Sequence, residues 1–207
     1  MLIGDPLEPE LQEKKGILFA VADGLGGMER GEVASGMAVL ELHHLFKAMV
    51  EFTSPSWLRE AFRKVNQRIF GENKPLAVDE WMGTTLTASL FFKDQLTVGH
   101  VGDSRLYRIR EGVISRLTTD HSLDRYTLTR VVGTDSKMEA DIYQTEVEPG
   151  DTYVQCSDGL YSMVSDEEIS ATASSCSPEE GCRRLVELAN GNGGADNITL
   201  QIIRVES

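Results

Sequence analysis

The sequence has few cysteines, an excess of acidic over basic side chains and no long apolar run, and each of these features excludes a class of protein. Three cysteines among 207 residues form no CxxC pair, so we expect reduced thiols rather than a disulfide framework or a zinc ribbon. With 20 Lys and Arg against 33 Asp and Glu, the formal net charge is -13. Such a charge argues against nucleic acid as a partner, because a nucleic-acid groove needs clustered cations.

Apolar residues are plentiful but never form one long stretch. No window approaches the roughly 18 uninterrupted apolar residues of a membrane span, and no basic segment followed by an apolar one marks an export signal. We therefore expect a cytoplasmic protein with no membrane partner. An apolar content of 41% suffices for one well-packed core, which predicts a single domain over residues 1–207.

The first half of the chain shows one short apolar run and then helical periodicity. The run over residues 16–22 is typical of a strand that is buried on both faces. Helices are expected over 32–50 and from Pro55 onward, with Ser54 as the N-cap of the second one. Three stretches are expected to be loops, namely residues 1–15, 71–82 and 133–150.

From residue 83 onward the pattern changes to β-rich segments separated by turn signals, which predicts an antiparallel meander. After a strand over 152–156, two helices are expected to follow Ser165 and Ser177, each with Glu three residues later, the spacing of a capping box. A last strand is expected over 197–205. Helices grouped between runs of strands predict an α+β layered fold in which helices cover sheet faces.

Acidic residues recur where the predicted strands begin or end. Asp23 and Asp158 each follow a strand and precede a glycine, Asp196 precedes the last strand, and Asp120 follows an earlier strand. Carboxylates at strand ends can meet at one rim of a sheet and form the oxygen-rich site that Mg²⁺ or Mn²⁺ prefers. A single Asp-Gly pair is more often a plain turn, so only the whole set favours a metal site.

Six segments in a fixed order give this set a context. They are VADGLGGMERGEVAS, MGTTLTASL, VGHVGDSRLYRIREG, LTTDHSL, VQCSDGLYSMVSDEEI and GADNITLQII, and they lie within residues 17–203. In this order they resemble the motifs of the bacterial metal-dependent protein serine/threonine phosphatases of the 2C type, the PPM family. The resemblance implies a four-layer α-β-β-α sandwich of two antiparallel sheets flanked by helices.

The resemblance also implies the ligands of a metal centre. Asp23 matches the carboxylate that bridges two ions, Gly24 matches the residue that offers a backbone carbonyl, and Asp158 and Asp196 match the other carboxylate ligands. Asp120, in TTDHS, matches the residue that holds a third, weaker ion together with Asp158. The implied cofactors are two or three Mg²⁺ or Mn²⁺ ions, and the implied catalytic residues are Asp23, Asp158 and Asp196.

The implied activity is hydrolysis of phosphoserine and phosphothreonine by a metal-activated water, on a protein substrate phosphorylated by a Ser/Thr kinase. Two divalent ions lower the pKa of a shared water toward neutrality, so no protein nucleophile is required. Cys156 lies on an apolar strand two residues before Asp158, and no glycine-rich cradle ending in Arg follows it. We therefore interpret Cys156 as a packing residue rather than a nucleophile.

Three departures from the family pattern are visible. The strand with a phosphate-binding arginine and the Asn-Glu-Asp-like motif that usually precede the first glycine loop are not found, and Asp5 lies where the following segment is expected. Only LDRYT separates Ser122 from Leu128, where members of the family insert a flap. Met28 stands where some bacterial members carry His, and His121 is then the nearest candidate acid for the leaving group. Two alternatives stay open: His121 orients its neighbour Asp120, or the leaving group takes its proton from metal-bound water.

These departures keep a second function open, a catalytically impaired phosphatase-like sensor or regulatory binding module. Three retained carboxylates count against it, because unpaired carboxylates are costly to assemble. An acidic calcium-binding β-domain is a third reading, but no loop has the DxDxDG spacing. Two more side chains are assigned from context: Arg105 is expected to pair with a carboxylate, and Glu32 to act at a helix N-terminus or beside the metal centre.

Overall fold

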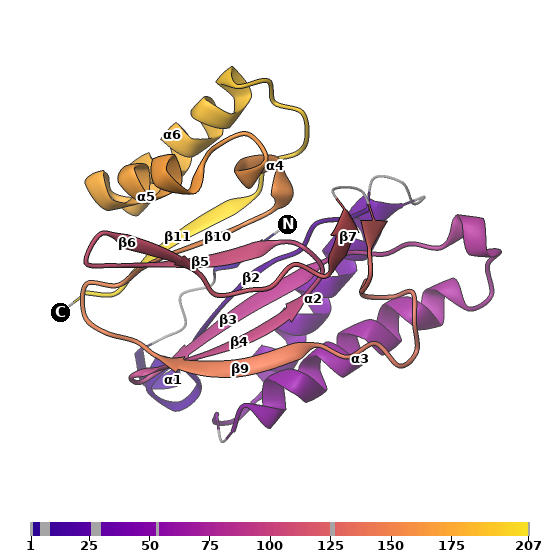
Figure 1. The fold of residues 1–207 in the computed structure, drawn as a ribbon. Helices are drawn as coiled ribbons and strands as arrows, with labels where there is room; N and C mark the ends of the chain where they lie inside the picture. Colours follow the sequence, from indigo (N-terminus) through magenta and orange to yellow (C-terminus); the bar gives the residue numbers. More distant parts are fainter. Residues whose placement is uncertain (1, 5–8, 26–29, 53, 125–126, 207) are drawn as a thin grey trace. The chain divides into compact units, whose positions relative to one another are not determined.

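Two antiparallel sheets, each with its own helices, account for most of the residues that the computed structural model describes (Figure 1). The described residues are 2–4, 9–25, 30–52, 54–124 and 127–206. The chain divides into a first unit of residues 1–102 and 121–146, and a second unit of residues 103–120 and 147–207. The sheets and helices confirm the α+β class, whereas the single domain over 1–207 stays a prediction.

The sheet of the first unit has the strand order β1-β2-β3-β4-β9. The predicted strands β2, β3 and β4 lie at its centre. The expectation of loops over 1–15 and 133–150 is wrong, because β1 and β9 form the two edges. An edge strand is held by its one neighbour and shows little apolar pattern of its own. The strands are β1 (Leu2–Gly4), β2 (Ile17–Val21), β3 (Leu86–Phe92), β4 (Gln95–Val101) and β9 (Asp141–Glu146).

The helices α2 and α3 of the first unit pack on one face of this sheet (Figure 1). Leu58 and Phe62 of α3 reach so close to Gly99 of β4 that a Cβ atom there would lie 2.6 Å from the Phe62 ring. The prediction of Ser54 as the N-cap is wrong by one residue, because α3 begins at Ser56 and Pro55 is its N-cap; the Ser54 Oγ accepts from the Ser56 N–H at 3.0 Å. The other elements of this unit are α1 (Pro9–Lys15), α2 (Gly31–Ala48), α3 (Ser56–Asn73), η1 (Val78–Glu80), β7 (Ser122–Asp124) and β8 (Thr127–Leu128).

The sheet of the second unit has the order β11-β10-β5-β6. Its strands lie where the sequence predicts strands, but the single meander expected from residue 83 onward is wrong. The chain instead makes two hairpins, β3-β4 in one sheet and β5-β6 in the other, because the Gly102-Asp103 turn leaves the first sheet. The strands are β5 (Arg105–Arg110), β6 (Val113–Arg116), β10 (Thr152–Cys156) and β11 (Leu200–Arg204).

Three helices follow in this unit: α4 (Asp158–Tyr161), α5 (Asp166–Ser175) and α6 (Pro178–Gly191). The sequence does not predict α4, which is a single turn. The capping box of Ser165 is confirmed at the start of α5. At the start of α6, the Glu180 N–H donates to the Ser177 Oγ, but the Glu180 carboxylate pairs with Arg183. No helix in the described part of the chain is long and apolar enough to cross a membrane.

Candidate metal centre

Asp23 lies just beyond the end of β2, and two threonines hold its backbone. The Asp23 N–H donates to the Thr85 Oγ1 at 3.0 Å, and the Thr85 N–H donates to the Asp23 carbonyl at 2.8 Å. The Thr84 hydroxyl donates to the same carbonyl at 2.8 Å. The TT pair of the MGTTLTASL segment therefore fixes the position at which the Asp23 carboxylate leaves the sheet.

Gly24 continues this arrangement by forming a β-bridge with Thr84. A Cβ atom at Gly24 would lie 2.1 Å from the carbonyl oxygen of Gly31, the first residue of α2, so no other side chain fits there. Because Gly24 has no side chain, its backbone packs directly against the start of α2. Asp5 and Met28, on which two of the sequence departures rest, lie outside the described residues.

In the second unit, the segments that carry Asp158 and Asp196 meet. Asp158 begins α4 directly after Ser157, whose hydroxyl donates to the Asn197 carbonyl at 3.3 Å. A Cβ atom at Gly159 would lie 2.3 Å from that same carbonyl oxygen. The backbone after Asp158 is therefore pressed against the backbone after Asp196. Asp158 is half-buried and Asp196 is exposed.

Asp120 has partners other than the predicted ion. Arg105 donates to it from Nη2 at 2.8 Å and from Nε at 3.2 Å, and Arg116 donates from Nη1 at 3.1 Å. The Arg105 guanidinium also lies over the Tyr161 ring at 3.6 Å. The predicted pairing of Arg105 with a carboxylate is confirmed. A cation at Asp120 would have to compete with two guanidinium groups, so the third-ion role of this residue stays a prediction.

Asp103 is an acidic residue that the sequence analysis does not identify, and its carboxyl interacts electrostatically with Asp158. Burial, and next the negative charge of Asp158, raise the pKa of the Asp103 carboxyl to about 6. The Tyr161 hydroxyl of α4 donates to the Asp103 carbonyl at 3.1 Å, which ties this turn to the helix that Asp158 begins. Two carboxyls in this relation carry excess negative charge, which a divalent cation relieves. The signal in the sequence was VGDSR, a glycine-flanked aspartate between two strands.

The predicted ligands are divided between the two units. Asp23 and Gly24 belong to the first, and Asp120, Asp158 and Asp196 to the second. Within neither unit do the described residues form a group of three or more His, Cys, Asp or Glu side chains that could hold a metal ion. Carboxylate and carbonyl oxygens are nevertheless the donors that Mg²⁺ and Mn²⁺ prefer. The donor types therefore fit the implied ions, and the ligand assignment stays a prediction.

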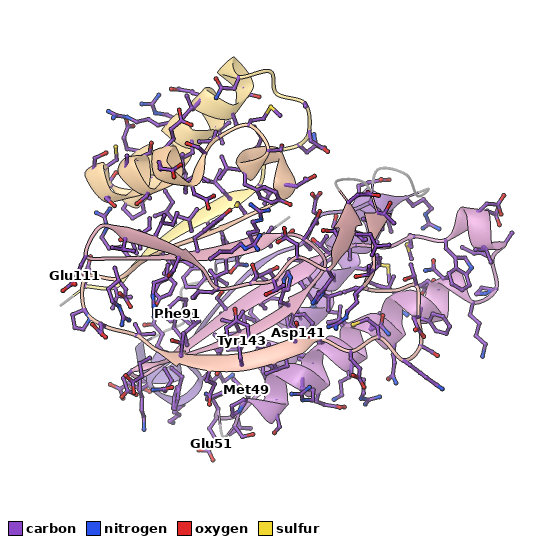
Figure 2. All side chains as sticks on the ribbon, in the orientation of Figure 1. Met49, Glu51, Phe91, Glu111, Asp141 and Tyr143 are labelled. Atoms are coloured by element: carbon purple, nitrogen blue, oxygen red, sulfur yellow. The ribbon has the colours of Figure 1, made fainter. Side chains whose placement is uncertain are left out.

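His121 is buried, and both of its ring nitrogens have partners. The Gly102 N–H donates to Nδ1 at 3.2 Å, so Nε2 is left to donate to the Asp141 Oδ2 at 3.1 Å. Asp141, labelled at the start of β9 in Figure 2, also accepts from Arg130 at 2.6 Å. The geometry fits a residue that holds the Gly102-Asp103 turn, and it gives no support to the predicted role of His121 as a leaving-group acid.

Cys156 is fully buried in the apolar core of the second unit. Burial raises the pKa of its thiol to about 12, so the thiolate needed for attack is scarce at neutral pH. This confirms that Cys156 is a packing residue. Glu32 lies in the first turn of α2 and is exposed, as expected of an acid at a helix N-terminus.

Comparisons with known proteins agree on one family. The family profile described as "Protein phosphatase 2C" matches residues 7–189. The chain is 35% identical over 206 residues to the serine/threonine protein phosphatase PstP of Mycobacterium tuberculosis. The matched region covers 91% of this chain and 40% of that protein. It is 33% identical over 210 residues to the serine/threonine phosphatase stp of Listeria welshimeri, covering 90% of this chain and 83% of that protein.

The fold is similar as well. A solved structure of the catalytic domain of serine/threonine protein phosphatase PstP in complex with two manganese ions superposes with a TM-score of 0.84 and 30% sequence identity. The similarity covers 100% of this chain and 97% of that one.

Proposed function

The chain belongs to the protein phosphatase 2C family, and from this premise we propose that it hydrolyses phosphoserine and phosphothreonine in proteins with the help of Mg²⁺ or Mn²⁺. The observation that carries the proposal is the similarity, over the full length of this chain, to a serine/threonine phosphatase domain that binds two manganese ions. The substrate is a phosphoprotein, which we expect to be the product of a Ser/Thr kinase. The cytoplasm stays the predicted compartment.

We propose Asp23, Gly24, Asp158 and Asp196 as residues that hold the ions. When bound, a pair of divalent ions supplies a nucleophilic water near neutral pH and neutralises charge on the phosphate. The role of the protein is to hold the oxygen donors in fixed positions. In the first unit, the hydrogen bonds of Thr84 and Thr85 to the backbone of Asp23 serve that purpose. Contacts between the backbones that follow Asp158 and Asp196 serve it in the second unit.

We further propose that Asp103, rather than Asp120, supports a weaker ion together with Asp158. Among the described residues, no arginine forms an ion pair with Asp103, whereas Asp120 has two such pairs, and the negative charge of Asp158 acts on the Asp103 carboxyl. Calorimetric titration with Mn²⁺ decides between the two. Asp103→Asn is expected to remove the weakest binding event and Asp120→Asn to leave it in place, and the opposite result would restore the prediction for Asp120.

The activity itself is tested with a phosphothreonine peptide and Mn²⁺. Turnover is expected to stop on addition of EDTA and to fall at least a hundredfold in Asp158→Asn, because one carboxylate ligand is lost. Asp94→Asn, an exposed aspartate in the β3-β4 turn, is the matched control and is expected to keep full activity. Turnover that persists in EDTA would contradict the mechanism. Metal binding with no turnover would identify the chain as the regulatory binding module instead.

A further inference from the structure

Two asparagines on helix α3 are buried almost completely. Asn66 is 1% exposed and Asn73 is 0% exposed, in a helix whose other buried residues are apolar. They are seven positions apart, which places them on the same face of the helix, two turns from each other. Because a buried amide is costly unless all its polar atoms are hydrogen-bonded, each must have specific partners.

The partners of Asn73 are main-chain groups of two separate loops. Its Nδ2 donates to the Met82 carbonyl at 2.7 Å and to the Gly133 carbonyl at 2.8 Å. In return, the Met82 N–H donates to the Asn73 Oδ1 at 2.9 Å. A single side chain thus joins the segment before β3 to the segment around residue 133.

Asn66 holds the second of these loops at another point. Its Nδ2 donates to the Asp135 carbonyl at 2.7 Å, and the Gly133 N–H donates to its Oδ1 at 2.7 Å. Gly133 has a φ of +100°, and a Cβ atom on it would lie 2.3 Å from Cγ2 of Ile69, which lies between the two asparagines on α3. The loop therefore rests directly on the helix between the two amides.

Both loops lead to the residues that hold Asp23. The Thr84 N–H donates to the Val132 carbonyl at 3.2 Å, and the Val132 N–H donates back to the Thr84 carbonyl at 2.9 Å. Thr84 in turn donates from its hydroxyl to the Asp23 carbonyl and forms the bridge with Gly24. A short path therefore leads from Asn73 to Asp23. Hydrogen bonds join Asn73 to Met82 and Thr84 to Asp23, and Met82 and Thr84 are two positions apart in the chain.

We propose that Asn73 and Asn66 are positioning residues for the metal centre. They fix the Met82–Thr84 and Val132–Gly133 segments to a rigid helix, and those segments fix the backbone of Asp23 and Gly24. An asparagine is required because its amide is both donor and acceptor, which leucine of similar size is not. This inference rests on the proposed function, since it assumes that Asp23 and Gly24 hold a cation.

The first test is the affinity for Mn²⁺, measured by calorimetry on the whole chain. Asn73→Leu keeps the branched shape and the number of heavy atoms of the side chain but removes three hydrogen bonds, and we expect the dissociation constant for Mn²⁺ to rise about tenfold. Val65→Ala is the control, because Val65 is a fully buried apolar residue of the same helix. We expect it to lower the unfolding temperature without changing the Mn²⁺ affinity. Asn66→Ser, which disturbs only the 133–135 loop, is a milder variant if Asn73→Leu does not fold.

The second test needs no metal. In the metal-free protein, hydrogen exchange at the amides of Leu25 and Thr85 reports whether the Asp23 segment is held, because both amides donate within it. We expect exchange at least tenfold faster in Asn73→Leu than in Val65→Ala. Equal exchange and equal Mn²⁺ affinity in the two variants would overturn the inference. A wild-type protein that binds no Mn²⁺ would refute the proposed function, while the exchange result would still decide whether the asparagines position this segment.

Discussion

At the scale of single residues, the role of an aspartate in this chain depends more on the groups that surround it than on its position in the sequence. Asp120 accepts from two arginines, whereas Asp103, on the turn before β5, lies near the charge of Asp158. Asp151 is buried, with 1% of its side chain exposed. It accepts two hydrogen bonds from Arg110, one from the Tyr153 hydroxyl and one from a backbone N–H. Such a residue serves stability rather than catalysis.

Asp151→Asn is expected to cost about 3 kcal/mol in the free energy of unfolding, because it leaves the Arg110 charge without its buried partner. Burial alone would raise the pKa of the Asp151 carboxyl, but the hydrogen bonds from Arg110, Glu148 N–H and Tyr153 outweigh it and lower that pKa. The stabilisation is therefore complete above the pKa of an unfolded Asp, about 3.9, and is lost as the pH falls through the lower folded value.

Urea unfolding at pH 7, 5 and 3 measures this effect. The gap between wild type and Asp151→Asn should stay constant from pH 7 to 5 and narrow by pH 3. Glu148→Gln is the matched control, since Glu148 pairs with the same Arg110 but is 56% exposed, and its loss should be below about 1 kcal/mol. A gap that widened toward pH 3 would contradict the assignment.

At the scale of elements, the first residues of α5 and α6 show that a local sequence motif does not by itself decide the helix cap. Both α5 and α6 begin with Ser followed by Glu three positions on, yet only Ser165 receives the full reciprocal pair of hydrogen bonds. At α6, Glu180 instead forms salt bridges with Arg183 and Arg184, one turn further along the helix. The same four-residue motif therefore gives two different caps, decided by which basic residues follow.

Ser165→Ala is expected to lower the stability by about 1 kcal/mol, the usual worth of a capping hydroxyl. Ser177→Ala is expected to cost less, because Glu180 makes no return bond there and Pro178 already favours the start of the helix. Thermal unfolding of the two variants gives the comparison. An equal or larger loss in Ser177→Ala would show that the return bond from Glu168 contributes nothing.

At the scale of the whole molecule, the residues proposed to hold the ions lie in both units of a chain with a net charge of -13. Cations can stabilise such a chain in two ways, by screening the general repulsion and by binding at a specific site. The two effects differ in their dependence on single residues. Only specific binding is lost when one ligand is removed from either unit.

Mn²⁺ at about 100 times its dissociation constant is expected to add about 2.7 kcal/mol of stability, and EDTA to reverse it. Asp23→Asn in the first unit and Asp196→Asn in the second should each abolish most of this gain. Calorimetric unfolding in NaCl of equal ionic strength provides the baseline for screening. If either variant kept the full gain, the residue concerned would not be a ligand.

The sequence by itself determined the elements whose signal is local. The strands β2, β3, β4 and β10 and the helices α2, α3, α5 and α6 follow from apolar period and capping residues within a few positions, and the ordered motifs indicated the family. Nearest-neighbour chemistry is enough for such features, because the side chains that decide them are close in the chain.

Only the tertiary structure decided features that depend on distant partners. The edge strands β1 and β9 exist because β2 and β4 offer them free hydrogen-bonding groups, and the break between β4 and β5 is decided by the sheet that each joins. Likewise, Asp120 meets Arg105 from 15 positions away, and Asn73 meets Gly133 from 60 positions away. A pattern along the chain cannot encode such pairs, since their energy arises only when folding brings the groups together and removes water from them.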